Sequence, residues 1–277
     1  MAGRRHRARR WVVAGVAVVV VVAAGGPFVF IHFIEGPAPA KLSLPKNGSG
    51  TRSATATAAG AGGASVAGTW KVGPGSTVGY RVQEVLMGQQ ATAVGRTAKV
   101  WGSLTISGTS VTNGSFTTDM ATVVSDQSQR NAQFDGRIMD VSTYPTATFR
   151  LTSPLSLAAL PLDGKTESYP ARGNLTMHGV TRPVSFSVSA ERSGAEVYVL
   201  ADIHIVFANW DISNPSVGGF VTTQSSGTLE VLLDLTRGTG NPVTATVPSQ
   251  SGPGGPGGGG PITVPRTTVP PLTVPAG

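Results

Sequence analysis

The sequence predicts an all-β domain, an antiparallel sandwich or barrel, between an N-terminal membrane segment and a low-complexity tail. Three observations support this organisation: an uncharged run near the N-terminus, apolar residues that alternate with period two in the middle, and an end rich in glycine and proline. The chain has 277 residues and no cysteine. Disulfide scaffolds, cysteine-ligated zinc sites and thiol nucleophiles are therefore excluded.

The net charge of +7 comes from the ends of the chain rather than from its middle. Residues 68–238 carry 12 basic and 13 acidic side chains, so this part is close to neutral. Five arginines lie in the first ten residues: Arg4, Arg5, Arg7, Arg9 and Arg10. A nucleic-acid-binding domain needs a basic face, which the middle of the chain lacks. We therefore predict no nucleic-acid partner.

Residues 11–34 form a run without fixed charge that is long enough to cross a bilayer. As a helix the run would span about 36 Å, against a hydrocarbon core of about 30 Å. We predict a cytoplasmic basic arm at residues 1–10, a single-pass transmembrane helix at residues 11–34 and an extracytoplasmic domain after it. A cleaved signal peptide is the alternative, with small residues near Gly25 as the cleavage site. Both interpretations put the rest of the chain outside the cytoplasm.

Two segments without apolar periodicity flank the folded domain. Residues 35–67 are rich in small and polar residues and predict a flexible linker. Residues 239–277 contain 9 glycines, 9 prolines and four copies of Thr-Val-Pro, which predicts a disordered tail with extended conformations. The folded domain is thereby predicted at residues 68–238, large enough to bury a core.

The alternation is clearest in residues 184–188, 197–207 and 229–235, where every second residue is apolar. Each of these segments is typical of a half-buried strand. Turn signals such as Ser107-Gly108 and Ser193-Gly194 separate the strands. Short strands at regular spacing favour an antiparallel sandwich or barrel.

Residues 125–140 interrupt this pattern and predict one short helix, capped by Ser125 or Asp126. Phe134 and Ile138 would face inward, and a helix across one end of a barrel leaves room for a ligand mouth. Asp126 and Arg130 are spaced as i and i+4. This spacing predicts an exposed ion pair or, in a second interpretation, a polar gate at the mouth.

The sequence carries no catalytic or metal-binding motif. It has no Gly-x-Ser-x-Gly elbow, no phosphate-binding loop and no histidine pair with metal-ligand spacing. His178 and His204 occupy polar positions of their strands, which predicts outward or turn histidines. We predict neither a catalytic residue nor a metal site, and no enzyme activity.

Four segments of the domain resemble the YceI-like domain family. The stretch Gln129–Leu151 resembles the family's helix, Tyr-Pro corner and strand, and Asn174–Val184 resembles its block ending in Gly-Val-Thr-(Lys/Arg)-Pro-Val. The remaining two lie at the ends: Trp70–Val72 with Ser76–Tyr80 resembles the first strand, and Gly227–Leu235 resembles the last. The chain departs from the family at residues 73–76, where Gly-Pro-Gly-Ser lacks the usual Asp and His.

The resemblance covers about residues 69–237 and implies a lipocalin-like eight-stranded antiparallel barrel. It also implies a bacterial, extracytoplasmic protein that binds an isoprenoid quinone or polyprenyl lipid and has no established catalysis. Eight strands leave an interior that holds side chains or one slim ligand. The inward strand positions then nominate nine ligand-binding residues: Tyr80, Val82, Phe149, Met177, Phe186, Val199, Ile203, Phe207 and Leu233.

We therefore predict a membrane-tethered protein that holds an isoprenoid lipid or quinone for carriage or storage, with no other cofactor. The alternative is a structural or stress-response surface module whose barrel is filled by its own side chains. In that alternative the same nine residues are ordinary core residues.

Overall fold

A computed structural model of the chain describes residues 38–45, 65–86, 88–158, 164–216 and 221–238. The predicted basic arm, transmembrane helix and C-terminal tail lie outside the described residues, as does most of the predicted linker. Among the residues that are described, no helix is long and apolar enough to cross a membrane.

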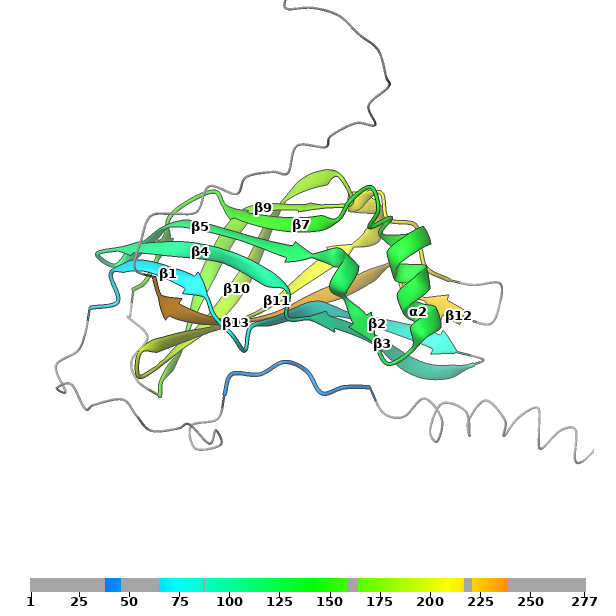
Figure 1. Cartoon of the computed structure of the whole chain (residues 1–277), viewed down its shortest axis with the longest axis horizontal. Coiled ribbons are helices and arrows are strands. Elements are labelled where there is room, and N and C mark those ends of the chain that lie inside the picture. Colours follow the sequence, from blue (N-terminus) through cyan, green and yellow to red (C-terminus); the bar gives the residue numbers. More distant parts are fainter. Residues whose placement is uncertain (1–37, 46–64, 87, 159–163, 217–220, 239–277) are drawn as a thin grey trace, which may run out of the picture. The chain divides into compact units, whose positions relative to one another are not determined.

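Thirteen strands form one continuous sheet in the described part of the chain (Figure 1). In chain order they are β1 (Gly68–Val72), β2 (Thr77–Leu86), β3 (Gln89–Thr97), β4 (Val100–Ser107), β5 (Ser110–Asp119), β6 (Val124–Ser125), β7 (Thr146–Leu151), β8 (Leu155–Ser156), β9 (Thr166–Met177), β10 (Val180–Ser193), β11 (Glu196–Val206), β12 (Val221–Thr223) and β13 (Ser226–Arg237). The long strands are those with the clearest period-two alternation, which confirms the all-β prediction.

The sheet closes on itself as an eight-stranded antiparallel barrel. Its strand order is β1-β4-β5-β7-β9-β10-β11-β13, and β1 pairs again with β13 to close the ring. Strand β13 also pairs with β2, which continues the line of β1 after a break at residues 73–76. Closure leaves the ring without an unpaired edge and defines an inside and an outside for every strand.

Ser76 connects this break to the neighbouring strand β13. Its side chain is buried, its hydroxyl donates to the carbonyl oxygen of Gly73 at 2.9 Å, and it accepts from the amide of Asp234 at 2.9 Å. Gly73 in turn donates its amide to the carbonyl oxygen of Asp234 at 2.7 Å. The Ser76 side chain and this backbone bond therefore together connect the break to β13.

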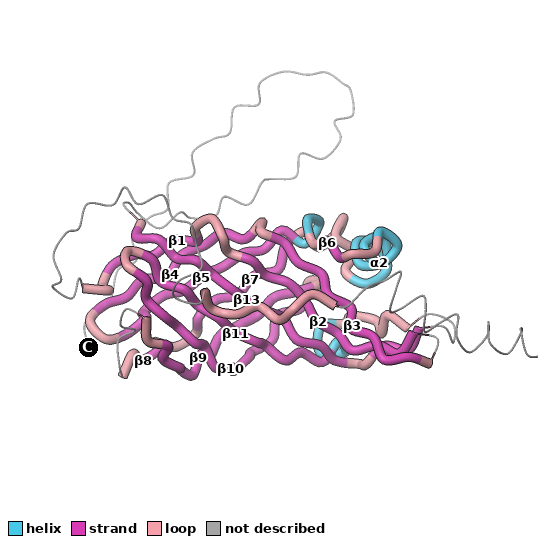
Figure 2. Tube along the Cα trace, turned by 90° about the horizontal axis from the view of Figure 1, so that it is seen from below, coloured by secondary structure: helices cyan, strands magenta, loops and turns pink. Residues whose placement is uncertain are grey.

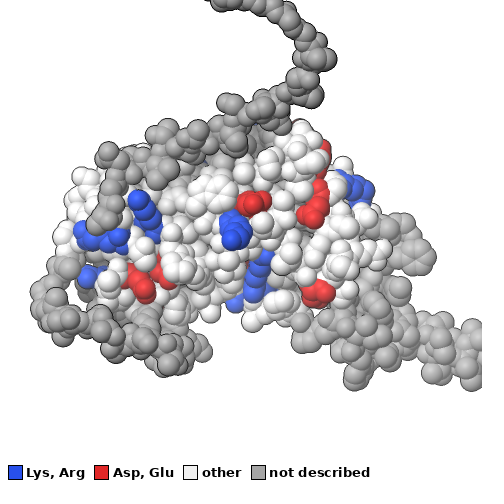
Figure 3. Space-filling model, in the orientation of Figure 1, with Lys and Arg blue, Asp and Glu red and all other residues white. Residues whose placement is uncertain are grey.

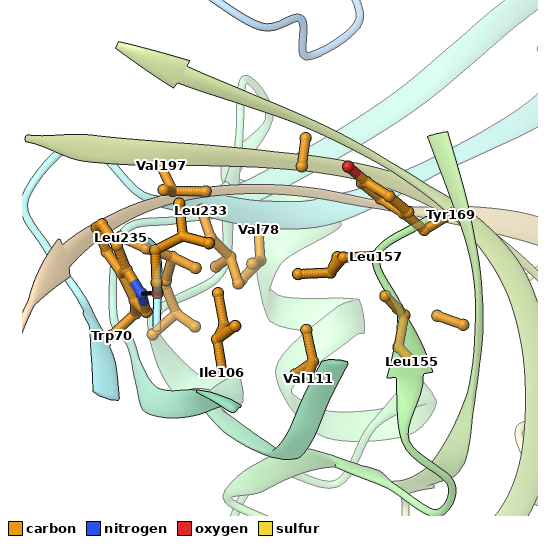
Figure 4. Close-up of a cluster of buried hydrophobic side chains, with 14 residues drawn as sticks. Trp70, Val78, Ile106, Val111, Leu155, Leu157, Tyr169, Val197, Leu233 and Leu235 are labelled. Atoms are coloured by element: carbon orange, nitrogen blue, oxygen red, sulfur yellow. Dashed lines mark hydrogen bonds between the residues drawn. The ribbon is translucent and has the colours of Figure 1, made fainter. Parts of the chain in front are cut away.

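The inward residues form two apolar clusters along the barrel. The first cluster surrounds Trp70 and the fully buried Leu235, and Figure 4 shows Trp70, Ile106 and Leu235 pointing into the interior from different strands. It includes Val66, 4% exposed, whose carbonyl accepts from the indole of Trp70 at 2.8 Å. The core thus starts two residues before the predicted boundary, where one valine among small residues gives no periodic signal.

The second cluster lies at the other end, beneath the predicted helix. Helix α2 (Ser128–Gln133) continues into a π-helical turn, η3 (Phe134–Ile138), and both lie across one end of the barrel (Figures 1 and 2). Two 3₁₀ turns join them in covering this end, η2 (Met120–Thr122) and η4 (Phe207–Trp210).

Phe134 and Met139 are buried and Ile138 packs against them, so the predicted inner face is confirmed. The predicted cap is wrong. Residue Gln127 is the N-cap and makes no side-chain capping bond. Ser125, two residues before the N-cap, instead accepts from the amide of Gln127 at 3.2 Å.

Candidate ligand-binding cavity

A cavity of about 650 Å³ runs through the barrel and is lined almost entirely by apolar side chains. Its walls come from both clusters, from Trp70 and Leu235 at one end to Phe134 and Ile212 at the other. A volume of this size lies within the range of ligand-binding pockets in proteins. The barrel interior is therefore only partly filled by its own side chains.

The structure brings all nine predicted site residues to the wall of this one cavity. Five are buried and four are half-buried, and they come from seven different elements. They are Tyr80 and Val82 (β2), Phe149 (β7), Met177 (β9), Phe186 (β10), Val199 and Ile203 (β11), Phe207 (η4) and Leu233 (β13). Their inward orientation follows from the strand alternation, and contact with a ligand stays a prediction.

Two aromatic side chains of the wall lie flat over glycines of the neighbouring strand. A methyl group on Gly95 would lie 2.4 Å from the ring of Tyr80, its cross-strand partner, and one on Gly173 would lie 2.3 Å from the ring of Phe149. Both contacts are far inside van der Waals distance. Glycine at these two positions is therefore what allows the two rings to lie along the cavity wall.

Tyr80 connects the wall to the helical cover. Its ring stacks on Phe134 with centroids 5.2 Å apart and an interplanar angle of 16°. Burial raises the pKa of Tyr80 to about 12, against the opposing effect of the nearby Arg130. The phenol is accordingly neutral at physiological pH and adds no charge to the cavity.

The polar lining residues gather at the end beneath α2, which we take as the mouth. Helix α2 and its N-cap supply three glutamines and Arg130, and β2 supplies Glu84, which is only 7% exposed. Arg130 bonds to Glu84 at 3.1 Å and to Asp126 at 2.6 Å. The pair that the sequence predicted between Asp126 and Arg130 is thus part of a three-residue cluster at the mouth.

Comparison with known proteins identifies this architecture. The sequence profile of the YceI-like domain family matches residues 70–235, more than half of the chain. The chain belongs to the YceI-like family. No curated protein matches the chain in sequence.

Three solved structures resemble the chain at low sequence identity. A polyisoprenoid binding domain from Saccharophagus degradans, implicated in plant cell wall breakdown, is 15% identical with a TM-score of 0.52, and the match covers 62% of this chain and 99% of that one. BcnA from Burkholderia cenocepacia is 19% identical with a TM-score of 0.44, covering 56% and 95%. The YceI protein of Campylobacter jejuni is 13% identical with a TM-score of 0.38, covering 50% and 83%. The first of these supports the fold.

Sequence reasoning missed the polar residues that this YceI-like domain turns inward. Glu84 follows Tyr80 and Val82 at the same strand phase, so the alternation itself could have identified it as an inward carboxylate. Thr223 also lines the cavity, opposite Glu84 in the pairing of β12 with β2. Strand β12 has only three residues, too few for a periodic signal.

The histidines of the YceI-like domain lie outside the cavity lining. His204 is exposed on β11, and His178 occupies the turn between β9 and β10 with φ of 48°, where it packs on Tyr144. Both placements agree with the prediction of outward or turn histidines. In the described segments, no group of three or more His, Cys, Asp or Glu side chains could hold a metal ion. Acidic and basic groups are interspersed on the face shown in Figure 3.

A second polar cluster lies on the outer wall. Glu230 points outward between Leu229 and Val231, yet it is only 1% exposed, because Arg81 and Arg96 cover it at 2.7 and 2.8 Å. Burial alone would raise the pKa of Glu230, but the two guanidinium groups outweigh it and hold the pKa below its usual value.

The same two arginines hold a segment that the sequence assigned to the linker. Arg81 donates to the carbonyl oxygen of Pro39 at 2.7 Å, and Arg96 donates to that of Ala40. We call residues 38–45 the strap. Its leucines at positions 42 and 44 are half-buried, whereas the other strap residues are exposed. Sequence reasoning did not foresee these contacts.

Proposed function

We propose that the barrel holds the isoprenoid chain of a lipid or quinone, for carriage or storage outside the cytoplasm. The observation that carries this proposal is the apolar cavity of about 650 Å³ between the two clusters. If each carbon takes roughly the 30 Å³ that a water molecule occupies in the liquid, the cavity holds about twenty carbons, or about four isoprene units. The related fold of the polyisoprenoid binding domain from Saccharophagus degradans supports the same ligand class.

The binding free energy of such a chain would come from apolar area removed from water, at about 25 cal/mol per Å². The cavity wall suits this task because most of its lining residues are apolar. A branched chain also fits a wall built from valine, leucine and aromatic rings, which present an uneven apolar surface. The filled-barrel alternative has no comparable support, because its side chains would have to occupy this volume.

We further propose that residues 11–34 tether the protein to the membrane, with residues 1–10 in the cytoplasm and the barrel outside. The uncharged run and the preceding arginines support this placement. Fractionation of cells followed by N-terminal sequencing tests it. The anchor predicts an intact N-terminus in the membrane fraction, and a soluble mature form starting near Gly25 would contradict it.

Binding is tested with the full chain in detergent micelles, by titration of tritiated geranylgeraniol. Ile203→Trp places a large ring in the cavity, since Ile203 lines it and is buried. His204→Trp is the matched control, because the next residue of β11 points outward. We expect affinity to fall at least about tenfold for Ile203→Trp and to stay within about twofold for the control.

Thermal melts of the same variants distinguish a reduced cavity volume from unfolding of the domain as the cause of weaker binding. If Ile203→Trp unfolds the barrel, Ala201→Val adds less volume at the same wall and repeats the test. Absence of saturable binding by the wild type would refute the proposed function. Unchanged affinity in both inward variants would place the ligand outside the cavity.

A further inference from the structure

The hydroxyl of Thr223 is the one cavity-lining side-chain atom among the described residues that is buried without a hydrogen-bond partner. Thr223 is 6% exposed and lies at the mouth, directly opposite Glu84. Its backbone is fixed on both sides: the amide donates to the Ser216 hydroxyl at 2.9 Å, and the carbonyl accepts from the Asn214 side chain at 3.0 Å. The hydroxyl is therefore held in place, and leaving it unpaired is costly.

The charges at the mouth restrict which ligand atom can satisfy this hydroxyl. Arg130 is the cation in the cavity lining, and it is bonded to the carboxylates of both Glu84 and Asp126. Two carboxylates and one guanidinium leave this cluster with one net negative charge. A phosphate or diphosphate group would be repelled there, and it would have to displace a carboxylate to reach Arg130.

We propose that Thr223 Oγ1 donates a hydrogen bond to an uncharged oxygen of the ligand's head group, so that the site selects prenyl quinones or prenols over prenyl phosphates. This inference rests on the proposed binding of an isoprenoid chain. The tail fills the apolar cavity, and the carbonyl or hydroxyl oxygen at its end lies at the mouth beside Thr223. The three glutamines of the mouth are neutral as well, which suits a neutral head group.

The test compares variants of the full chain in detergent micelles, with ligands that share one geranylgeranyl chain. The probes are geranylgeraniol, a naphthoquinone carrying the same chain, the corresponding hydrocarbon and geranylgeranyl diphosphate. Partition into micelles is common to all variants, so the ratio of variant to wild-type affinity is compared for each probe. Thr223→Val removes the hydroxyl, Thr223→Ser keeps it, and Thr222→Val is the control at an exposed neighbour.

We expect Thr223→Val to lower the binding affinity for the alcohol and for the quinone about three- to tenfold, which is the range that one net hydrogen bond gives. Binding of the hydrocarbon should be unchanged, and Thr223→Ser should restore the affinity for the neutral oxygen ligands. Asp126→Asn removes one negative charge at a partly exposed position. It should therefore raise the binding affinity for the diphosphate several-fold relative to the affinity for the alcohol.

Two results would overturn the inference while leaving the proposed function intact. An equal loss for the hydrocarbon and the alcohol in Thr223→Val would show that the hydroxyl acts on the fold of the mouth and not on the ligand. Wild-type preference for the diphosphate, insensitive to Asp126→Asn, would show that charge does not select the head group. Failure of all four probes to bind the wild type would refute the proposed function itself.

Discussion

At the scale of single residues, glycines that lie opposite aromatic rings determine the shape of the cavity wall. The ring of Tyr80 occupies the space above Gly95, from where it reaches Phe134 of the helical cover. A side chain on Gly95 would push the ring out of this position. The wall therefore depends on which residues lack a side chain as much as on which residues are apolar.

We expect Gly95→Ala to destabilise the domain by about 2 kcal/mol, because the added methyl overlaps the ring of Tyr80. In a Tyr80→Ala background the same change should cost less than about 0.5 kcal/mol. Chemical denaturation of the single and double variants measures the coupling. Gly136→Ala is the control, since nothing lies within 4 Å of the added methyl. Equal costs in both backgrounds would contradict the assigned clash.

Glu230 is a stability determinant whose contribution depends on pH. Its pKa is held below the usual value in the folded protein, so its stabilising effect is complete at neutral pH and is lost as pH falls through that lowered pKa. We expect Glu230→Gln to cost about 2 kcal/mol at pH 7, because both arginines lose their charged partner. The difference from wild type should shrink towards about pH 3 in denaturation curves. A difference that does not change with pH would argue against the ion pairs.

The strap, residues 38–45, bonds to the barrel although its sequence has no periodicity that predicts an ordered element. Four residues that alternate as Leu-Ser-Leu-Pro are too few for a strand prediction, and the bonds to Pro39 and Ala40 use backbone carbonyls, which no side-chain pattern reveals. The long strands were predictable for the opposite reason. In β11 with the first residue of η4, and in β13, the same alternation continues through residues 197–207 and 229–235.

Replacing residues 38–45 by a Gly-Ser segment of equal length should lower stability by about 1–2 kcal/mol, through the loss of two hydrogen bonds and the exposure of two leucines. The same replacement at residues 52–59, in the predicted linker, is the control. Denaturation midpoints of the two full-length variants give the comparison. If both replacements leave the midpoint unchanged, the strap contacts do not stabilise the barrel.

At the scale of the whole molecule, strand alternation predicted an antiparallel sandwich or barrel and the direction of its side chains, but not the space inside it. An inward Ile203 has the same strand phase in a filled barrel and in a hollow one, so alternation identifies the lining without measuring the volume. The cavity depends on how residues from six or more elements fit together, and local patterns contain no information on that fit. The family resemblance supplied the hollow barrel that periodicity could not.

Native mass spectrometry of the full chain, purified from its own host in mild detergent, shows whether the barrel holds an isoprenoid. We expect a bound lipid whose mass series differs by whole isoprene units and which carries a neutral head group. Ile203→Trp should reduce the bound fraction, and His204→Trp should leave it unchanged. A single unliganded mass for the wild type, obtained under conditions in which added geranylgeraniol also fails to bind, would contradict the account.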